Sequence, residues 1–224
     1  MKRQVSIEEI SDGRLYTRRD LVRAGCNGCK GCSECCGGMG ESVILDPLDL
    51  YRMAQGLGCN AGVLLEEGKI ELNVVDGLIL PNLKMRDGEE KCAFLNTEGR
   101  CSIHPFRPGI CRLFPLGRYY PENEKGFRYF LQVHECPMPN KTKVRIERWM
   151  DMPGLAEYEE YVNAWHYFLE DLQTLLPDAG EEMTRNISLY LLKMFYLTNW
   201  TREDFYIQFY RKLKEAREVF GIEQ

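Results

Sequence analysis

Residues 26–36 hold five of the ten cysteines in this 224-residue chain. Four of them, Cys26, Cys29, Cys32 and Cys35, recur at every third position, and Cys36 follows directly. Two thiolates spaced as C-x2-C can reach one metal from a tight turn, and the glycines between them let the backbone curl around it. A segment this rich in glycine has few side chains to bury, so metal–thiolate bonds or disulfides must order it. Overlapping C-x2-C pairs with five further cysteines downstream predict a metal or iron–sulfur centre.

The expected compartment favours metal over disulfides. The first ten residues lack the apolar core of a secretory signal, and the apolar stretch at 189–197 is too short to span a bilayer. We therefore expect a cytoplasmic protein without membrane contact, whose thiols stay reduced. A disulfide framework is the alternative, but the neighbours Cys35 and Cys36 would pair awkwardly. The net charge of −5 gives no pull toward nucleic acid.

Zinc and an iron–sulfur cluster compete for this ligand set, because both accept four cysteine thiolates. The C-x2-C-x2-C run with a distant Cys136-Pro137 favours an iron–sulfur cluster, of the 4Fe–4S type, over zinc. Side chains of adjacent residues diverge, so Cys35 and Cys36 either serve two sites or only one of them is a ligand. The number of centres stays open at this point.

The order of the cysteines and their neighbours resembles one family. The matching residues are Cys29-x2-Cys32-x2-Cys35-Cys36, Cys92-x-Phe94-Leu95, Gly99-x-Cys101-x-Ile103-His104, Arg107-Pro108-x2-Cys111-Arg112-x-Phe114-Pro115 and Cys136. The chain is similar over this stretch to the CxxCxxCC cysteine-cluster family, described as a zinc- or iron-chelating domain, which includes flagellin lysine N-methylases.

The resemblance implies a ligand set and a candidate reaction. The ligands it implies are Cys29, Cys32, Cys35, Cys36, Cys92, Cys101, Cys111 and Cys136. Cys26 and Cys59 fall outside the pattern and are treated as spare. The methylase members imply methyl transfer from S-adenosylmethionine to a protein lysine, although no Gly-x-Gly nucleotide loop follows a strand here.

Four other side chains lie close to these cysteines in the sequence. Arg107 and Arg112 flank Cys111, where guanidinium groups would offset the negative charge of a thiolate centre or hold an anionic substrate; a surface salt bridge is the alternative. His104 and His134 could replace a cysteine as ligand, but a hydrogen bond to a thiolate or to the backbone is favoured.

The elements that must position these residues predict an α+β protein. A cysteine-rich half, residues 1–140, forms short strands and loops around one or two metal centres, and a helical half, residues 141–224, packs on it as one compact unit. Helix-start boxes occur at Ser6–Glu9 and Thr17–Asp20. Periodicity and turn signals predict a helix at 47–55 and a helical turn at 108–112, strands at 42–46 and 127–133, hairpins at 69–86 and 91–104, and helices at 154–176, 181–197 and from Thr201 through 205–220.

The sequence thus predicts a cytoplasmic metal-binding protein. Two alternatives remain open: an S-adenosylmethionine-dependent protein lysine methyltransferase, and an electron-transfer protein. The partner would be a protein substrate or a small molecule, and the oligomeric state is undetermined.

Overall fold

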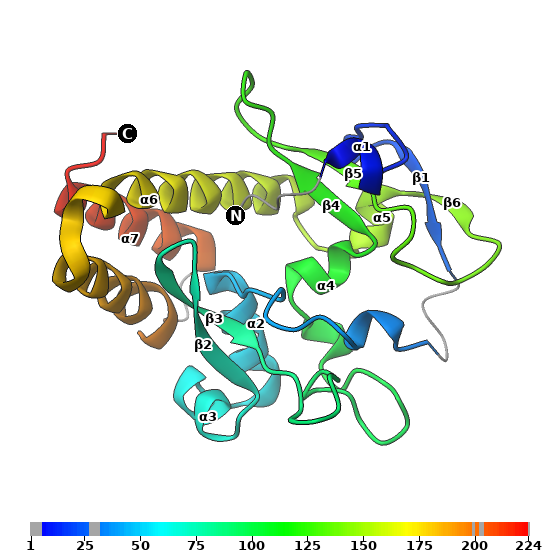
Figure 1. Ribbon diagram of the computed structural model, residues 1–224, viewed down its shortest axis with the longest axis horizontal. Coiled ribbons are helices and arrows are strands. Elements are labelled where there is room, and N and C mark those ends of the chain that lie inside the picture. Colours follow the sequence, from blue (N-terminus) through cyan, green and yellow to red (C-terminus); the bar gives the residue numbers. More distant parts are fainter. Residues whose placement is uncertain (1–5, 27–31, 199, 202–203, 224) are drawn as a thin grey trace.

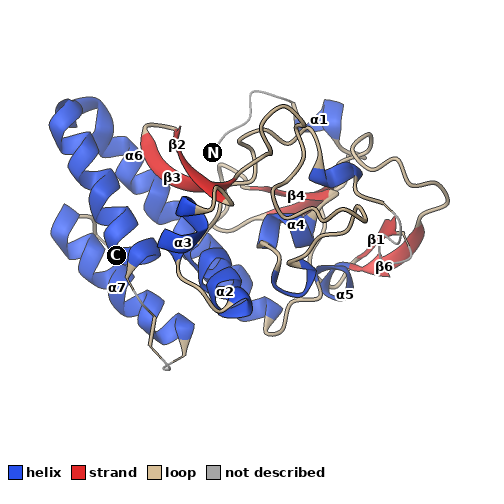
Figure 2. Ribbon diagram, turned by 90° about the horizontal axis from the view of Figure 1, so that it is seen from below, coloured by secondary structure: helices blue, strands red, loops and turns tan. Residues whose placement is uncertain are grey.

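The computed structural model describes residues 6–26, 32–198, 200–201 and 204–223. It confirms the predicted α+β class, because three two-stranded antiparallel sheets accompany a group of longer helices. The long helices gather at one end of the molecule with the hairpin of residues 70–83 beside them, and the other short strands with long loops form the other end (Figure 1). The same division is visible from below in Figure 2, where loops surround the short helices α4 (Gly109–Leu113) and α5 (Ile146–Met150).

The elements are short except in the C-terminal part. The helices are α1 (Ile7–Ile10), α2 (Pro47–Leu57), α3 (Ala61–Glu66), α4 (Gly109–Leu113), α5 (Ile146–Met150), α6 (Leu155–Leu191) and α7 (Phe205–Phe220), with 3-10 turns η2 (Glu34–Cys36) and η3 (His104–Phe106) and the π-helical segment η4 (Leu192–Leu197). The strands pair as β1 (Leu21–Gly25) with β6 (Thr142–Arg145), β2 (Ile70–Val75) with β3 (Leu78–Leu83), and β4 (Leu116–Tyr119) with β5 (Arg128–Leu131). Among the described helices, none has the combination of length and apolarity that crossing a membrane requires.

Helix α2 was predicted at 47–55 from the residues at its ends, and the structure confirms it. Asp46 accepts from the backbone N–H of Asp49 at 2.8 Å, and the Asp49 carboxylate accepts from the N–H of Asp46 in return. Pro47 occupies the first turn and Gly58, in the left-handed conformation, ends the helix. These three signals are local, so the sequence alone contains them.

The predicted hairpin around Asp76-Gly77 is confirmed as β2 and β3. Both turn residues have positive φ, 47° and 85°, as a tight hairpin turn requires. The segment predicted as a strand at 42–46 lies alongside β3, since Leu45 N–H donates to Pro81 and Leu83 N–H donates to Val43. It forms a single bridge there rather than a regular strand.

The second hairpin predicted at 91–104 is present without regular strands. The chain turns back at 96–100, where the N–H of Asn96 donates to Arg100 at 2.8 Å, and the N–H of Ser102 donates to Phe94 at 2.9 Å across the two arms. This segment makes isolated bridges, Met85 with Cys92 and Leu95 with Cys101. The Asn96 side chain accepts from the N–H groups of Glu98 and Arg100 and so closes a compact turn in place of a strand ladder.

The C-terminal helices follow the prediction except at the start of the last one. The two helices predicted at 154–176 and 181–197 are confirmed, because α6 is interrupted at Gly180, whose backbone is not helical (φ 69°, ψ 169°). The second of them continues into η4. Helix α7 begins at Phe205, because Asp204 accepts from the N–H groups of Tyr206 and Ile207; the capping box expected at Thr201 is not its start.

The helical half packs directly on the cysteine-rich half. Tyr161 of α6 donates to Asp46 at 3.0 Å and accepts from the N–H of Leu48, while Tyr196 of η4 donates to the carbonyl of Leu45. These tyrosines are buried in an aromatic core shared by α6, η4 and α7. The start of α2 is therefore held from the helical side.

Candidate metal centre

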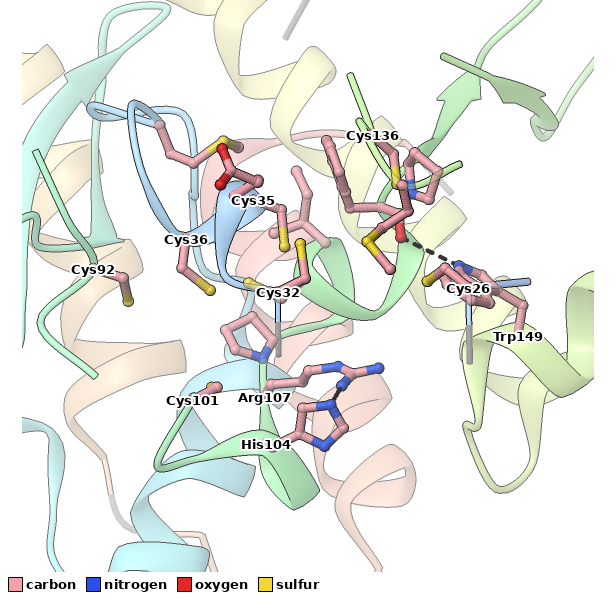
Figure 3. A pocket seen from close by; sticks show the side chains of 18 of the residues that line it. Cys26, Cys32, Cys35, Cys36, Cys92, Cys101, His104, Arg107, Cys136 and Trp149 are labelled. Carbon is pink, nitrogen blue, oxygen red and sulfur yellow. Dashed lines mark hydrogen bonds between the residues drawn. The ribbon is translucent and has the colours of Figure 1, made fainter. Parts of the chain in front are cut away.

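Most of the cysteines line one cavity of about 640 Å³. Every described cysteine except Cys59 lines it: Cys26, Cys32, Cys35, Cys36, Cys92, Cys101, Cys111 and Cys136. Figure 3 shows seven of these side chains around the opening. Cys29, one of the eight predicted ligands, lies outside the described residues. Residues more than a hundred positions apart in the sequence thus meet at one place.

Backbone hydrogen bonds bring Cys36 and Cys92 together. The N–H of Cys92 donates to the carbonyl of Cys36 at 2.7 Å, immediately after the 3-10 turn that carries Cys35 and Cys36. The N–H of Gly38 donates to Glu90 at 2.8 Å and extends the contact. Cys101 joins the same group through its bridge with Leu95.

Helix α4 carries Cys111 to the cavity and is fixed at its first residue. The N–H of Gly109 donates to the buried carboxyl group of Asp49 at 2.7 Å. A side chain at position 109 would overlap the hydroxyl of Tyr158, so glycine is required for this close approach. Cys111 therefore depends on contacts from both α2 and α6.

A separate strand pair places Cys26 and Cys136. Cys26 follows β1, and the last residue of that strand, Gly25, pairs with Thr142 at the start of β6. Cys136 precedes β6 in the loop whose Lys141 donates back to the Cys136 carbonyl at 2.6 Å. Nearby on α5, the Trp149 indole donates to the carbonyls of Leu113 and Phe114 and forms part of the wall.

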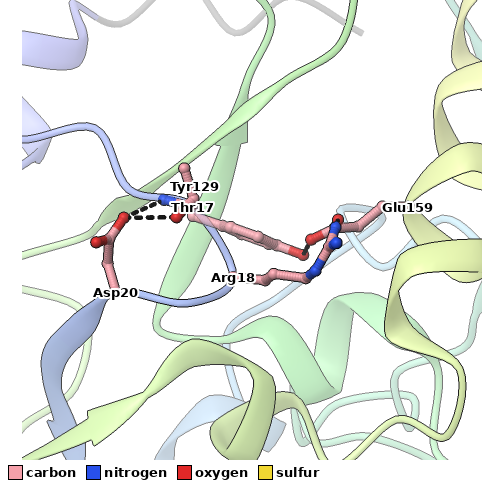
Figure 4. Close-up of polar contacts among 5 residues, drawn as sticks. All are labelled: Thr17, Arg18, Asp20, Tyr129 and Glu159. Carbon is pink, nitrogen blue, oxygen red and sulfur yellow. Dashed lines mark hydrogen bonds and ion pairs between the residues drawn. The ribbon is translucent and has the colours of Figure 1, made fainter.

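The turn before β1 corrects another prediction. Thr17 and Asp20 do interact, since both the N–H and the hydroxyl of Thr17 donate to Asp20 at 2.7 Å (Figure 4). A strand follows them rather than the expected helix. The intervening Arg18 forms an ion pair with Glu159 of α6 at 2.6 Å, and Tyr129 donates to the same carboxylate. This contact ties the entry of β1 to the long helix.

Burial changes the pKa of several cavity thiols. Burial raises the pKa of Cys92 and of Cys101, and raises that of Cys111 well above its usual value; nearby thiol charges add to the effect. Cys35 differs, because a hydrogen bond from the Cys36 thiol lowers the pKa of Cys35 to about 7. The same bond is the main cause that raises the pKa of Cys36. Metal ligation deprotonates thiols, so binding here would release protons.

The donor set fits zinc or an iron–sulfur cluster, since both take cysteine sulfur. Within the described ranges, no three Cys, His, Asp or Glu side chains are already arranged to hold a metal ion.

The four predicted neighbours of the cysteines have different positions. Arg107 and His104 line the cavity and contact each other, and burial together with the charge of Arg107 lowers the pKa of His104. Arg112 is buried and absent from the lining; its guanidinium donates to the carbonyls of Arg107, Asp151 and Pro105. His134 is exposed and does not line the cavity.

Several cavity residues were not predicted from the sequence. Cys26 was treated as spare, although its regular spacing from Cys29 was a signal in its favour. Trp149 carried no signal, because its place depends on how α5 packs against α4. Asp49, which holds α4 without lining the cavity, was not singled out either.

The cavity residues can now be compared with known proteins. Residues 28–137 match the family model CxxCxxCC, described as "putative zinc- or iron-chelating domain". The chain contains a CxxCxxCC domain. All the cavity-lining cysteines except Cys26 fall within the matched residues. No curated protein and no solved structure matches the chain. The CxxCxxCC match supports a metal cofactor.

Proposed function

We propose that the CxxCxxCC domain holds an iron–sulfur cluster, in preference to zinc, through thiolates drawn from the eight predicted cysteines. The convergence of cysteines from five separate segments on one cavity carries this proposal. If these segments came together only to bury apolar surface, we would expect aliphatic and aromatic side chains at their meeting point, as in the core around α6. When bound, such a cluster supplies electron transfer or a Lewis-acidic iron. The helical half contains no cysteine, and its role in this proposal is to support the cysteine-rich half on which it packs.

Metal analysis tests the proposal directly. The protein is purified anaerobically and its iron, acid-labile sulfide and zinc are measured beside its visible absorption. We expect equal molar amounts of iron and sulfide and a broad absorption band in the blue region of the visible spectrum. A colourless protein with stoichiometric zinc would show that the centre is a zinc site, and a protein without metal would overturn metal binding itself.

Two matched cysteine variants show whether the cavity is the site. Cys101→Ser removes a thiol that lines the cavity, whereas Cys59→Ser removes one that does not. We expect Cys101→Ser to lose metal, with an affinity lowered at least about tenfold, and Cys59→Ser to keep it. Equal metal content in both variants would place the centre elsewhere.

A methyltransferase is the second candidate, favoured by the shape of the cavity. Its volume of about 640 Å³ lies in the range of small-molecule pockets, and apolar side chains such as Met138, Val144 and Trp149 form part of the wall. S-adenosylmethionine bound there would lie beside the thiolates. Calorimetric titration of the metal-loaded protein with S-adenosylmethionine tests this candidate, and an absence of heat would count against it.

A further inference from the structure

We infer that two copies of this chain pair through the open edge of strand β2, Ile70–Val75, and so join their β2–β3 hairpins into one continuous sheet. The inference does not depend on the metal centre. It follows from the direction of the backbone groups of β2, from the apolar face of the hairpin, and from the match between β2 and a second copy of itself.

The outer edge of β2 carries backbone groups that β3 does not use. On β3, the N–H of Ile79, the carbonyl of Pro81 and the N–H of Leu83 all bond to partners outside β2. In an antiparallel pair, residues directly opposite each other bond either toward each other or both away. Among the described strands, β2 pairs with β3 alone. The β2 residues opposite those three therefore turn their N–H and C=O groups to an open edge: Val74, Leu72 and Ile70.

The side chains of these β2 residues belong to a face of the hairpin that is apolar along its whole length. Opposite them on the same face lie three apolar residues of β3: Leu83, Pro81 and Ile79. Ile70 is only 2% exposed, whereas Leu72 is 42% and Val74 is 72% exposed. The apolar face is thus uncovered along the same edge at which the backbone groups are open. Pairing with another strand would cover the face and satisfy the backbone groups together.

The edge of β2 also lacks the features that usually keep strands of different molecules apart, which are lysines, prolines and bulges. Strand β6, at the edge of another sheet, contains Lys143 and Arg145, and its pairing with β1 is irregular. Strand β2 pairs with β3 in unbroken register and contains one charged residue, Glu71. Nothing in its sequence opposes pairing with a further strand.

The occupant that fits this edge is a second copy of β2. With a two-fold axis at Leu72, the two Leu72 residues lie opposite each other, and Ile70 lies opposite Val74 of the second copy. Residues whose backbone groups point outward then meet residues of the same kind, as an antiparallel ladder requires. The exposed apolar side chains also meet each other, and the two-fold axis makes the contact closed, with two copies only.

The polar side chains of β2 match in the same register. Glu71 lies opposite Asn73 of the second copy, so that the amide can donate to the carboxylate. The two side chains already share one face, because Asn73 donates to Glu71 at 3.3 Å within one chain. Lys69 comes opposite Val75 of the second copy, next to Asp76, which has the opposite charge. An axis at Glu71 would instead place two carboxylates opposite each other, which is unfavourable.

Sedimentation velocity of the anaerobically purified full chain over a dilution series tests the inference. We expect the wild type to be a dimer that dissociates on dilution. Hydrogen exchange of the same samples should show that the amides of Leu72 and Val74 are protected in the concentrated protein and lose protection on dilution.

Three lysine substitutions at positions that are not buried test the surface and its register. Val74→Lys places a charge in the apolar contact and should raise the dissociation constant at least about tenfold. Asn73→Lys adds the same charge one residue away, opposite Glu71 of the second copy, and should leave the dimer as tight as the wild type or tighter. Val219→Lys on α7, at a site that is 57% exposed, is the control and should change nothing. Metal content should be the same in all three variants.

A wild type that stays monomeric at every concentration, or that forms larger assemblies, would overturn the inference. So would a dimer that Val74→Lys leaves intact, or one that Asn73→Lys weakens as much as Val74→Lys does. Circular dichroism identifies any variant that fails to fold, and the hydrogen exchange of the wild type then decides the question, since unprotected Leu72 and Val74 amides in a dimer would place the contact elsewhere.

Discussion

At the scale of single residues, two arginines that flank Cys111 in the sequence have different surroundings. Arg107 lines the cavity near the cysteines, whereas Arg112 is only 5% exposed and donates to three backbone carbonyls. Spacing along the chain places both within five residues of Cys111, but it does not say which way each side chain turns. Arg112 holds the loop between η3 and α4 in shape rather than offsetting thiolate charge.

The substitution Arg112→Lys should lower the free energy of unfolding by about 2 kcal/mol, because a lysine cannot reach all three carbonyls and leaves buried acceptors unsatisfied. Urea unfolding of the metal-loaded protein measures the change. The exposed Arg19→Lys serves as the control and should leave the midpoint unchanged. Equal midpoints for the two variants would show that the Arg112 contacts contribute nothing to stability.

At the scale of elements, the position of α4 is set from two sides. Asp49 of α2 accepts from the N–H of Gly109, and Tyr158 of α6 lies where a side chain at 109 would be. The hydroxyl of Tyr158 in turn accepts from Arg118 of β4 at 2.8 Å. The orientation of Cys111 therefore depends on buried polar contacts that no cysteine makes.

Gly109→Ala should destabilise the protein by about 2–3 kcal/mol, because the added methyl group must displace the buried Tyr158 hydroxyl. Gly62→Ala in α3 is the matched control; its methyl group meets only the Asn60 side chain, at 3.1 Å. Thermal unfolding compares the two. A Gly109→Ala protein as stable as the Gly62→Ala protein would mean that α4 shifts freely.

The burial of Asp49 gives stability a pH dependence. Burial, followed by the charge of Asp46, raises the pKa of Asp49 from 3.8 to about 8. Between these values the folded state binds more protons than the unfolded state, so stability is greatest at low pH and declines as pH rises toward 8. Asp49→Asn keeps the acceptor for Gly109 and should flatten this decline. Unfolding midpoints from pH 5 to 8 measure it, with exposed Asp87→Asn as control; parallel slopes for wild type and Asp49→Asn would contradict the assignment.

How far the sequence predicts these elements depends on how local their causes are. Helix α2 and the β2–β3 hairpin were predicted because Asp46, Pro47, Asp76 and Gly77 fix them within a few residues. The turn of the hairpin predicted at 91–104 is local, because the Asn96 side chain closes it, and it was predicted correctly; its arms form isolated bridges rather than the predicted strands. The position of Cys26 depends on β1 meeting β6, a pairing across more than a hundred residues that no periodicity records.

At the scale of the whole molecule, a bound metal would connect segments of the cysteine-rich half that are far apart in the sequence. The cysteine-rich half has two-stranded sheets and loops, while the helical half has a continuous aromatic core around Tyr161, Trp165 and Phe209. Binding free energy of a structural metal is then part of the folding free energy of the first half alone.

Removing the metal should therefore unfold the cysteine-rich half and leave much of α6 and α7 folded. Hydrogen exchange after treatment with a chelator measures this: protection should fall around Cys92 and Cys111 and persist in α6. The same chelator saturated with metal beforehand is the control. Unchanged protection around Cys92 in metal-free protein would show that the fold does not need the metal.

The β1–β6 pair has a consequence for the limits of the CxxCxxCC domain. Strand β1 ends at Gly25 and β6 begins at Thr142, so each strand lies just outside one end of the matched residues 28–137. The chain therefore enters and leaves the matched segment at neighbouring points, as it does in domains that are inserted into other proteins. Its two ends are fastened by strands that it does not contain. A fragment cut at the family limits would lose both strands, and with them the closure that places Cys136 opposite Cys92.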